Sequence, residues 1–299
     1  MAITYKQAKK PHQEPEGAIR VGSVRTFLDA IEKLNSEREF FIFFRGHSNF
    51  SYELLPTIYR NEGWIKNEDI LHKELILRCP SDFDQHASTF QTLVKMQHYS
   101  LPTRLLDITM NPLAALYFAC SKGEIPNEAG EVVVFKVPKR EVKYYDSDTV
   151  SVIANISRRP ATFEVPVEDL SKEEFNKQSE IGYLLHEIKK EKPYFQSVIV
   201  SEHLESTVCV KPMMDNSRII KQDGAFFLFG VNRSKLRPSR IPSRYAVTTE
   251  SRRILIKHDE KDKILGQLAS LGITEASLFP EIDSVAKHLR HQYKVANKI

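Results

Sequence analysis

The sequence predicts an α+β protein in which a mixed central β-sheet is surrounded by helices. Short runs that are apolar on both faces, at 40–44 and 132–137, are typical of central strands buried on two sides. Between and around them, the segments 24–34, 86–97 and 112–120 carry apolar residues at helical spacing. Because strands and helices are mixed along the chain with no strong linker, we expect one main domain with helical additions.

Local signals define the remaining elements in chain order. Ser23 stands where a side chain can cap the first helix, and Pro112 stands where the first turn of a helix accepts proline. The middle of the chain predicts helices interrupted by prolines, and short strands and then two more helices follow. These elements are expected at 147–195 (helices), at 207–210, 225–229 and 253–256 (strands), and at 259–271 and from about 280 (helices).

This reading divides the chain into three parts. Residues 1–20 are polar, carry two prolines and predict a flexible N-terminal arm. Residues 21–257 form the main domain, with a helical insertion near 147–195. Residues 258–299 form a C-terminal helical extension that we expect to pack on the same domain.

Composition excludes several classes of protein. Over 299 residues, 43 basic and 39 acidic side chains give a net charge of +4, far below the positive charge expected of a protein that coats nucleic acid. No apolar run approaches the roughly 20 residues of a membrane-spanning helix, and the first residues lack the apolar core of a secretory signal. The three scattered cysteines, Cys79, Cys120 and Cys209, fit a reducing compartment. We expect a soluble, cytoplasmic protein without membrane contact.

Two segments early in the chain offer cationic and aromatic side chains. Arg45 at the end of the first buried strand can fork onto a phosphate or a ribose, and Gly46 permits close approach of backbone or ligand. Tyr52 can stack on a planar ring, and Arg60 supplies a second cation. The alternatives are an ordinary structural ion pair for Arg45 and simple packing for Tyr52, with Arg60 in solvent.

The densest group of polar residues lies between 97 and 112. It contains an imidazole, hydroxyls, a guanidinium and a carboxylate on a path from loop to strand to helix, namely His98, Tyr99, Thr103, Arg104, Asp107 and Thr109. Helix N-termini bind anions, which favours a ligand site here. Alternatively, Asp107 caps the helix or pairs with Arg104, and His98 belongs to the core. A metal site lacks a third ligand at a recognisable spacing.

Two later segments complete the candidates. Gln222 and Asp223 stand where a polar turn enters an apolar strand, so an amide there can orient a ribose hydroxyl and a carboxylate can stabilise a cationic centre. Ordinary turn chemistry at Asp223-Gly224 is the alternative. The segment 233–244 is rich in arginine and predicts an extended basic loop. Such a loop can contact nucleic acid or an acidic partner, and the alternative is that its charges are simply solvated.

These segments, in this order, resemble the FRG domain family. The resemblance rests on Phe44-Arg45-Gly46, on the signature from Gln97 to Pro112, on Arg218-Ile219 with Gln222, Gly224 and Phe226, and on Leu278-Phe279-Pro280. The sequence departs from the family pattern at Ser100, where glycine is usual, and at Ile108, where tryptophan is usual. The resemblance implies an origin in bacteria or phages, sometimes beside defence or toxin genes.

A weaker resemblance links the motif order to the ADP-ribosyltransferase superfamily. It implies a split sheet, NAD as substrate, and transfer of ADP-ribose to a macromolecule or to water. By motif, Arg45 is the NAD-holding arginine, Thr103 and Thr109 are the hydroxyl candidates, and Gln222 occupies the region of the late catalytic glutamate. Because glutamine cannot act as a carboxylate, Asp107 or Asp223 would supply the negative charge.

The resemblance therefore implies two sets of residues. The catalytic set is Arg45, Asp107 and Gln222. The nucleotide-binding set is Arg45, Gly46, Tyr52, Arg60, His98, Tyr99, Thr103, Arg104 and Thr109. The alternatives are a non-catalytic module that binds a nucleotide or senses a phage component, and an activity directed at nucleic acid.

Overall fold

The computed structural model describes residues 16–34, 38–84, 86–123, 127–166, 170–247, 253–282, 285–286 and 290. Most of the expected N-terminal arm lies outside these residues.

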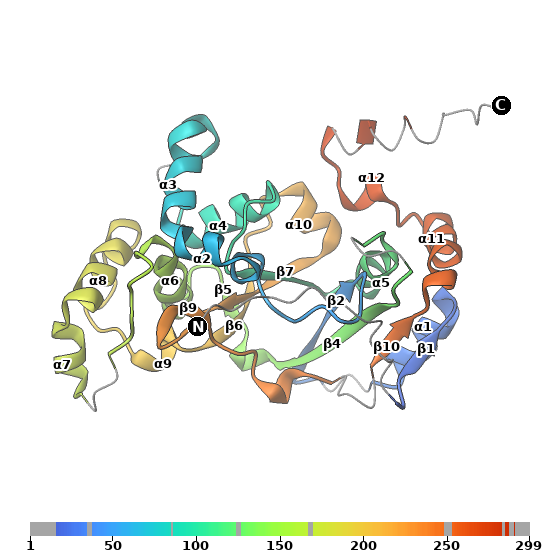
Figure 1. Ribbon diagram of the computed structural model, residues 1–299, viewed down its shortest axis with the longest axis horizontal. Helices are drawn as coiled ribbons and strands as arrows, with labels where there is room; N and C mark the ends of the chain where they lie inside the picture. Colours follow the sequence, from blue (N-terminus) through green and yellow to red (C-terminus); the bar gives the residue numbers. More distant parts are fainter. Residues whose placement is uncertain are drawn as a thin grey trace.

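A mixed eight-stranded sheet runs through the centre of the molecule (Figure 1). Its outer pairs, β1–β10 and β5–β6, are parallel, and its other neighbouring strands are antiparallel. The strands in spatial order are β1 (Ile19–Val21), β10 (Ile254–Ile256), β4 (Gly130–Pro138), β2 (Phe40–His47), β3 (Leu105–Thr109), β7 (Gly224–Phe229), β6 (Thr207–Lys211) and β5 (Lys143–Tyr144). A small ribbon pairs β8 (Val231–Asn232) with β9 (Ser234–Pro238). The predicted α+β class is confirmed.

Helices cover both faces of the sheet. One cluster of buried side chains joins the β10–β4–β2 half to α1 (Val24–Glu32), α5 (Pro112–Cys120) and α11 (Lys261–Ser270). A second joins the β7–β6 half to α4 (Thr89–His98), α6 (Asp148–Asn155), α7 (Lys172–Lys177), α8 (Ser179–Glu191) and α9 (Ser201–Leu204). A third lies under the 3-10 helix η1 (Thr57–Arg60) and α2 (Glu62–Lys66). The other helices are α3 (Glu68–Arg78), α10 (Ser217–Gln222) and α12 (Glu275–Leu278). Within the described residues, no helix is long and apolar enough to cross a membrane.

Local sequence accounts for where the helices begin. Ser23 caps α1 and accepts a hydrogen bond from the backbone N–H of Thr26, as expected. Asn111 caps α5 through its side-chain oxygen, and Pro112 fills the first turn. The helices near 147–195 are present as α6, α7 and α8 with breaks between them. The helix expected from about 280 falls largely on residues outside those described.

The strand β2 is longer than the sequence indicates. We expected it to stop at Arg45-Gly46, but its pairing with β4 continues to His47, opposite Glu131. Phe43 and Phe44 pack into clusters on opposite faces, which confirms a strand buried on two sides. By contrast, β2 pairs with β3 only at Phe44 and Thr109. The two strands therefore diverge beyond this pair, where the side chains of Arg45 on β2 and Asp107 on β3 lie 3.9 Å apart.

Candidate functional site

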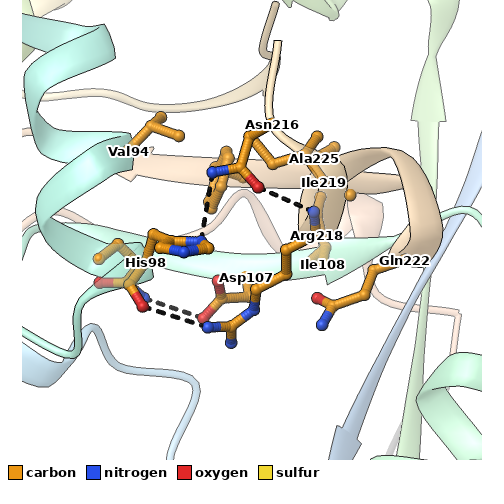
Figure 2. A pocket seen from close by; sticks show the side chains of 12 residues that line it. Val94, His98, Asp107, Ile108, Asn216, Arg218, Ile219, Gln222 and Ala225 are labelled. Atoms are coloured by element: carbon orange, nitrogen blue, oxygen red, sulfur yellow. Dashed lines mark hydrogen bonds between the residues drawn. The ribbon is translucent and has the colours of Figure 1, made fainter. Parts of the chain in front are cut away.

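A pocket lies where β3, β7, α10 and the C-terminal end of α4 meet (Figure 2). Its polar lining comes from three segments of the chain, so no single motif builds it. The polar side chains that line it are Gln97, His98, Asp107, Asn216, Arg218 and Gln222. His98, Asp107 and Arg218 turn toward the same space. The three predicted residues His98, Asp107 and Gln222 are thus brought together.

Asp107 is an accessible carboxylate held by a fixed amide. Its side chain is 51% exposed. Gln97 donates a hydrogen bond from Nε2 to Oδ2 of Asp107 over 2.9 Å. Thr103, which is buried, donates from its hydroxyl to Oε1 of Gln97 over 2.6 Å. Because that bond engages the amide oxygen, the amide nitrogen of Gln97 faces Asp107. Thr103 therefore orients the amide instead of lining the pocket.

Arg45 reaches Asp107 from the neighbouring strand. Its Nη1 donates to the backbone carbonyl of Asp107 and lies 3.9 Å from the carboxylate oxygen Oδ2. Burial of the side chain, which is 14% exposed, is the main reason that the pKa of Arg45 falls to about 10. Asp107 opposes this fall and Arg60 adds to it. Arg45 remains a cation at neutral pH. The 3.9 Å between its guanidinium and the carboxylate of Asp107 is too long for the two charges to compensate each other fully.

His47 supports Arg45 from behind. Nε of Arg45 donates to Nε2 of His47 over 2.9 Å, while Nδ1 of His47 is buried with no hydrogen-bond partner among the described residues. Burial, followed by the nearby Arg45 and Arg60, lowers the pKa of His47 well below its ordinary value. The ring of Tyr52 stands edge-on to His47 at 6.1 Å between centroids. Tyr52 and Arg60 therefore both lie near the Arg45–His47 pair.

His98 sits among groups from the far end of the chain. Its Nδ1 lies 3.2 Å from Nδ2 of Asn216, and its Nε2 lies 3.3 Å from a carboxylate oxygen of Glu281. Burial lowers the pKa of His98, and Glu281 acts against that shift. Nη1 of Arg218 donates to the backbone carbonyl of His98 over 3.3 Å. Tyr99 packs edge-on against the imidazole and is 60% exposed.

Gln222 lines the pocket, and Thr109 binds its backbone. The hydroxyl of Thr109 donates to the backbone carbonyl of Gln222 and accepts from the N–H of Asn111. The amide of Gln222 donates over 3.0 Å to the carbonyl of Leu278, the last residue of α12. Thr109 is thus engaged with backbone, and the Gln222 amide is directed toward the C-terminal segment.

Two predicted ligand residues have other roles. Arg104 is fully buried, and its guanidinium makes a two-pronged ion pair with Glu68 and a further bond to the carbonyl of Phe229. These bonds replace both expectations for Arg104, contact with a ligand and pairing with Asp107. Gly46 packs against α5, and a Cβ on it would lie 2.0 Å from the carbonyl oxygen of Ala115. The glycine therefore permits close approach of the α5 backbone to β2.

The basic segment 233–244 is not an extended loop. Part of it forms β9, and Lys235 is fully buried, with Nζ 3.3 Å from the carboxylate of Glu68. Arg244 pairs with Glu141 over 2.7 Å. Arg233, Arg237 and Arg240 stay exposed. The positive surface available to a partner is therefore smaller than the sequence indicates, because Lys235 is buried and Arg244 is paired with Glu141.

Several residues in and around the pocket were not selected as site residues from the sequence. Arg218 belongs to the family signature but was not chosen as a ligand, Asn216 stands two residues before it, and His47, outside the pocket lining, directly follows the Arg-Gly pair. The helix-capping pattern at Asn216, whose side chain accepts from the N–H of Arg218, was a usable signal. Gln97 lies inside the dense motif. Nothing local marks Glu281. Within the described ranges, no three His, Cys, Asp or Glu side chains gather as a metal site.

Comparison with known proteins gives one match. Residues 41–128 match the model of the FRG domain family. No curated protein and no solved structure matches. The matched segment contains Arg45, Gln97, His98 and Asp107, whereas Asn216, Arg218 and Gln222 lie beyond it. The pocket therefore joins the FRG segment to a later part of the same chain.

Proposed function

We propose that this pocket binds NAD and that the protein cleaves the bond between nicotinamide and ribose, passing ADP-ribose to a macromolecule or to water. The observation that carries the proposal is the accessible carboxylate of Asp107, oriented by Gln97 and placed 3.9 Å from the guanidinium of Arg45. An anion and a cation side by side suit a substrate that carries a positive glycosidic nitrogen and negative phosphates.

The reaction balances with these groups. The bond from ribose C1′ to the pyridinium nitrogen breaks, and its electron pair leaves with neutral nicotinamide. The ribosyl group becomes oxocarbenium-like, and the carboxylate of Asp107 stabilises that positive charge. Water or a nucleophile of the target then bonds to C1′ and releases its proton to solvent. Arg45 clamps the nucleotide, and Gln222 orients the ribose. A role in phage defence or as a toxin, in the cytoplasm, belongs to the same proposal.

The test measures NAD binding and nicotinamide release for purified wild type and two matched variants. Asp107→Asn keeps the shape of the side chain and removes its charge, so release should fall about a hundredfold, equivalent to about 3 kcal/mol of barrier. Asp223→Asn is the control, because Asp223 is exposed in a left-handed conformation with φ of 47° that asparagine also adopts. It should retain activity.

Three results would overturn all or part of this proposal. Wild type that neither binds nor cleaves NAD at millimolar concentration removes the proposal. Equal loss in both aspartate variants removes the assignment to Asp107. Binding without release, with or without cell extract, assigns the pocket to nucleotide sensing instead of catalysis.

A further inference from the structure

The C-terminal segment Glu275–Glu281 covers one side of the pocket through three separate contacts. The carbonyl of Leu278 accepts from Gln222. The ring of Phe279 lies 4.6 Å from the guanidinium carbon of Arg218. The carboxylate of Glu281 lies 3.3 Å from Nε2 of His98. Three pocket-lining residues are therefore engaged by one short piece of the same chain.

Glu281 is poorly satisfied where it sits. Both of its carboxylate oxygens are buried, and neither has a hydrogen-bond partner among the described residues. Its nearest cationic candidate is His98, a group that is charged only when protonated. A buried carboxylate without hydrogen bonds is costly, so this contact is weakly held.

Arg218 is a cation with unused capacity. Across the described part of the chain, its guanidinium makes one side-chain hydrogen bond, to the carbonyl of His98, and no ion pair with a carboxylate within 4.0 Å. It lines the pocket beside His98 and stacks on Phe279. Guanidinium donors fit phosphate oxygens in pairs, and the flat face on Phe279 fixes their plane.

We propose that Arg218 and His98 form a phosphate subsite of the pocket and that Glu281 occupies it until a phosphate group displaces the carboxylate. This rests on the proposed function in that the phosphate is the pyrophosphate of the nucleotide. Arg218 then takes the nucleotide-binding role that the resemblance implied for Arg104. Glu281 acts as an internal competitor for the phosphate. The apparent affinity for phosphate is the intrinsic affinity multiplied by the fraction of molecules in which Glu281 has left the subsite.

The experiment titrates inorganic pyrophosphate, and separately ADP-ribose, into the full chain by calorimetry. Glu281→Gln should bind pyrophosphate about tenfold more tightly than wild type, within the usual range of coupling between competing groups. Arg218→Gln should bind it about tenfold more weakly. The controls are Glu53→Gln, which removes one negative charge from an exposed position, and Lys221→Gln, which removes an exposed cation on α10. Both should match wild type, and unfolding midpoints confirm that each variant is folded.

The outcomes separate this proposal from the proposed function. Unchanged affinity in Glu281→Gln, or in Arg218→Gln, overturns the subsite even if NAD is cleaved. Pyrophosphate binding that follows the expected order supports the subsite even if nicotinamide is never released. Tighter binding of ADP-ribose than of pyrophosphate by Glu281→Gln assigns the phosphate to a nucleotide, whereas equal binding assigns the subsite to free phosphates and removes the link to the nucleotide.

Discussion

Glu68 holds two buried cations together, and its neutralisation should destabilise the whole fold. Arg104 binds its carboxylate at 2.9 Å and 2.5 Å, and Lys235 lies 3.3 Å from the same group. Burial pushes the pKa of Glu68 upward, but the two cations outweigh it and hold the pKa below its ordinary value. Glu68→Gln keeps the shape of the side chain and removes the one charge that compensates both partners.

The magnitude follows from the burial of all three side chains. Arg104 and Lys235 are 0% exposed, and Glu68 is 3% exposed, so water cannot replace the lost carboxylate. Removing one partner of a buried ion pair costs about 3–5 kcal/mol, because the remaining charge is left uncompensated. In domains of somewhat smaller size, 1 kcal/mol moves the midpoint by about 2–4 °C. We therefore expect Glu68→Gln to lower the thermal midpoint by about 10 °C.

Thermal and urea unfolding, followed by circular dichroism at pH 7, measure the effect. The control is Glu62→Gln, which breaks an exposed pair with Lys66 at 2.6 Å and should leave the midpoint unchanged. If Glu68→Gln unfolds at the wild-type temperature, Arg104 is not held by this carboxylate, and its assignment to the core instead of to a ligand is refuted.

Three further predictions concern stability and the site. Because burial lowers the pKa of His72 to about 4, the unfolded chain takes up a proton near pH 5 that the native state does not, so this residue should make wild type about 2 kcal/mol less stable at pH 5 than at pH 8. In urea titrations, His72→Gln should lose about that much of the pH dependence, and an unchanged dependence would contradict this contribution. Gly46→Ala should fail to fold stably, because a Cβ there meets the backbone of α5. Gly266→Ala, whose added Cβ would have nothing within 4 Å, should raise the free energy of unfolding in urea by about 0.5–1 kcal/mol. Similar effects of the two substitutions would contradict this packing. Gln97→Leu should lower kcat for nicotinamide release about tenfold with little change in KM, since it removes only the group that orients Asp107; steady-state kinetics with unchanged kcat would count against that role.

The sequence by itself determined the elements whose causes are local. The run at 40–44 is apolar at every position, which only a strand buried on two faces accommodates, and the structure has β2 there. Ser23 caps α1 and Pro112 stands in the first turn of α5, as expected, because both roles depend only on the next few backbone groups. The density of polar residues near Asp107 likewise indicated where a pocket would lie.

Only the tertiary structure decided which side chains meet. Arg104 follows Thr103 in the same motif, yet its partner Glu68 lies 36 residues away, and Lys235 joins them from β9. Glu281 reaches His98 from the far end of the chain. Such partners are set by the order in which strands enter the sheet and by where β2 and β3 diverge. The spacing of residues along the chain fixes the face of a strand or helix to which a side chain points. It does not fix which other element the fold places opposite that side chain, so the strand order cannot be read from it.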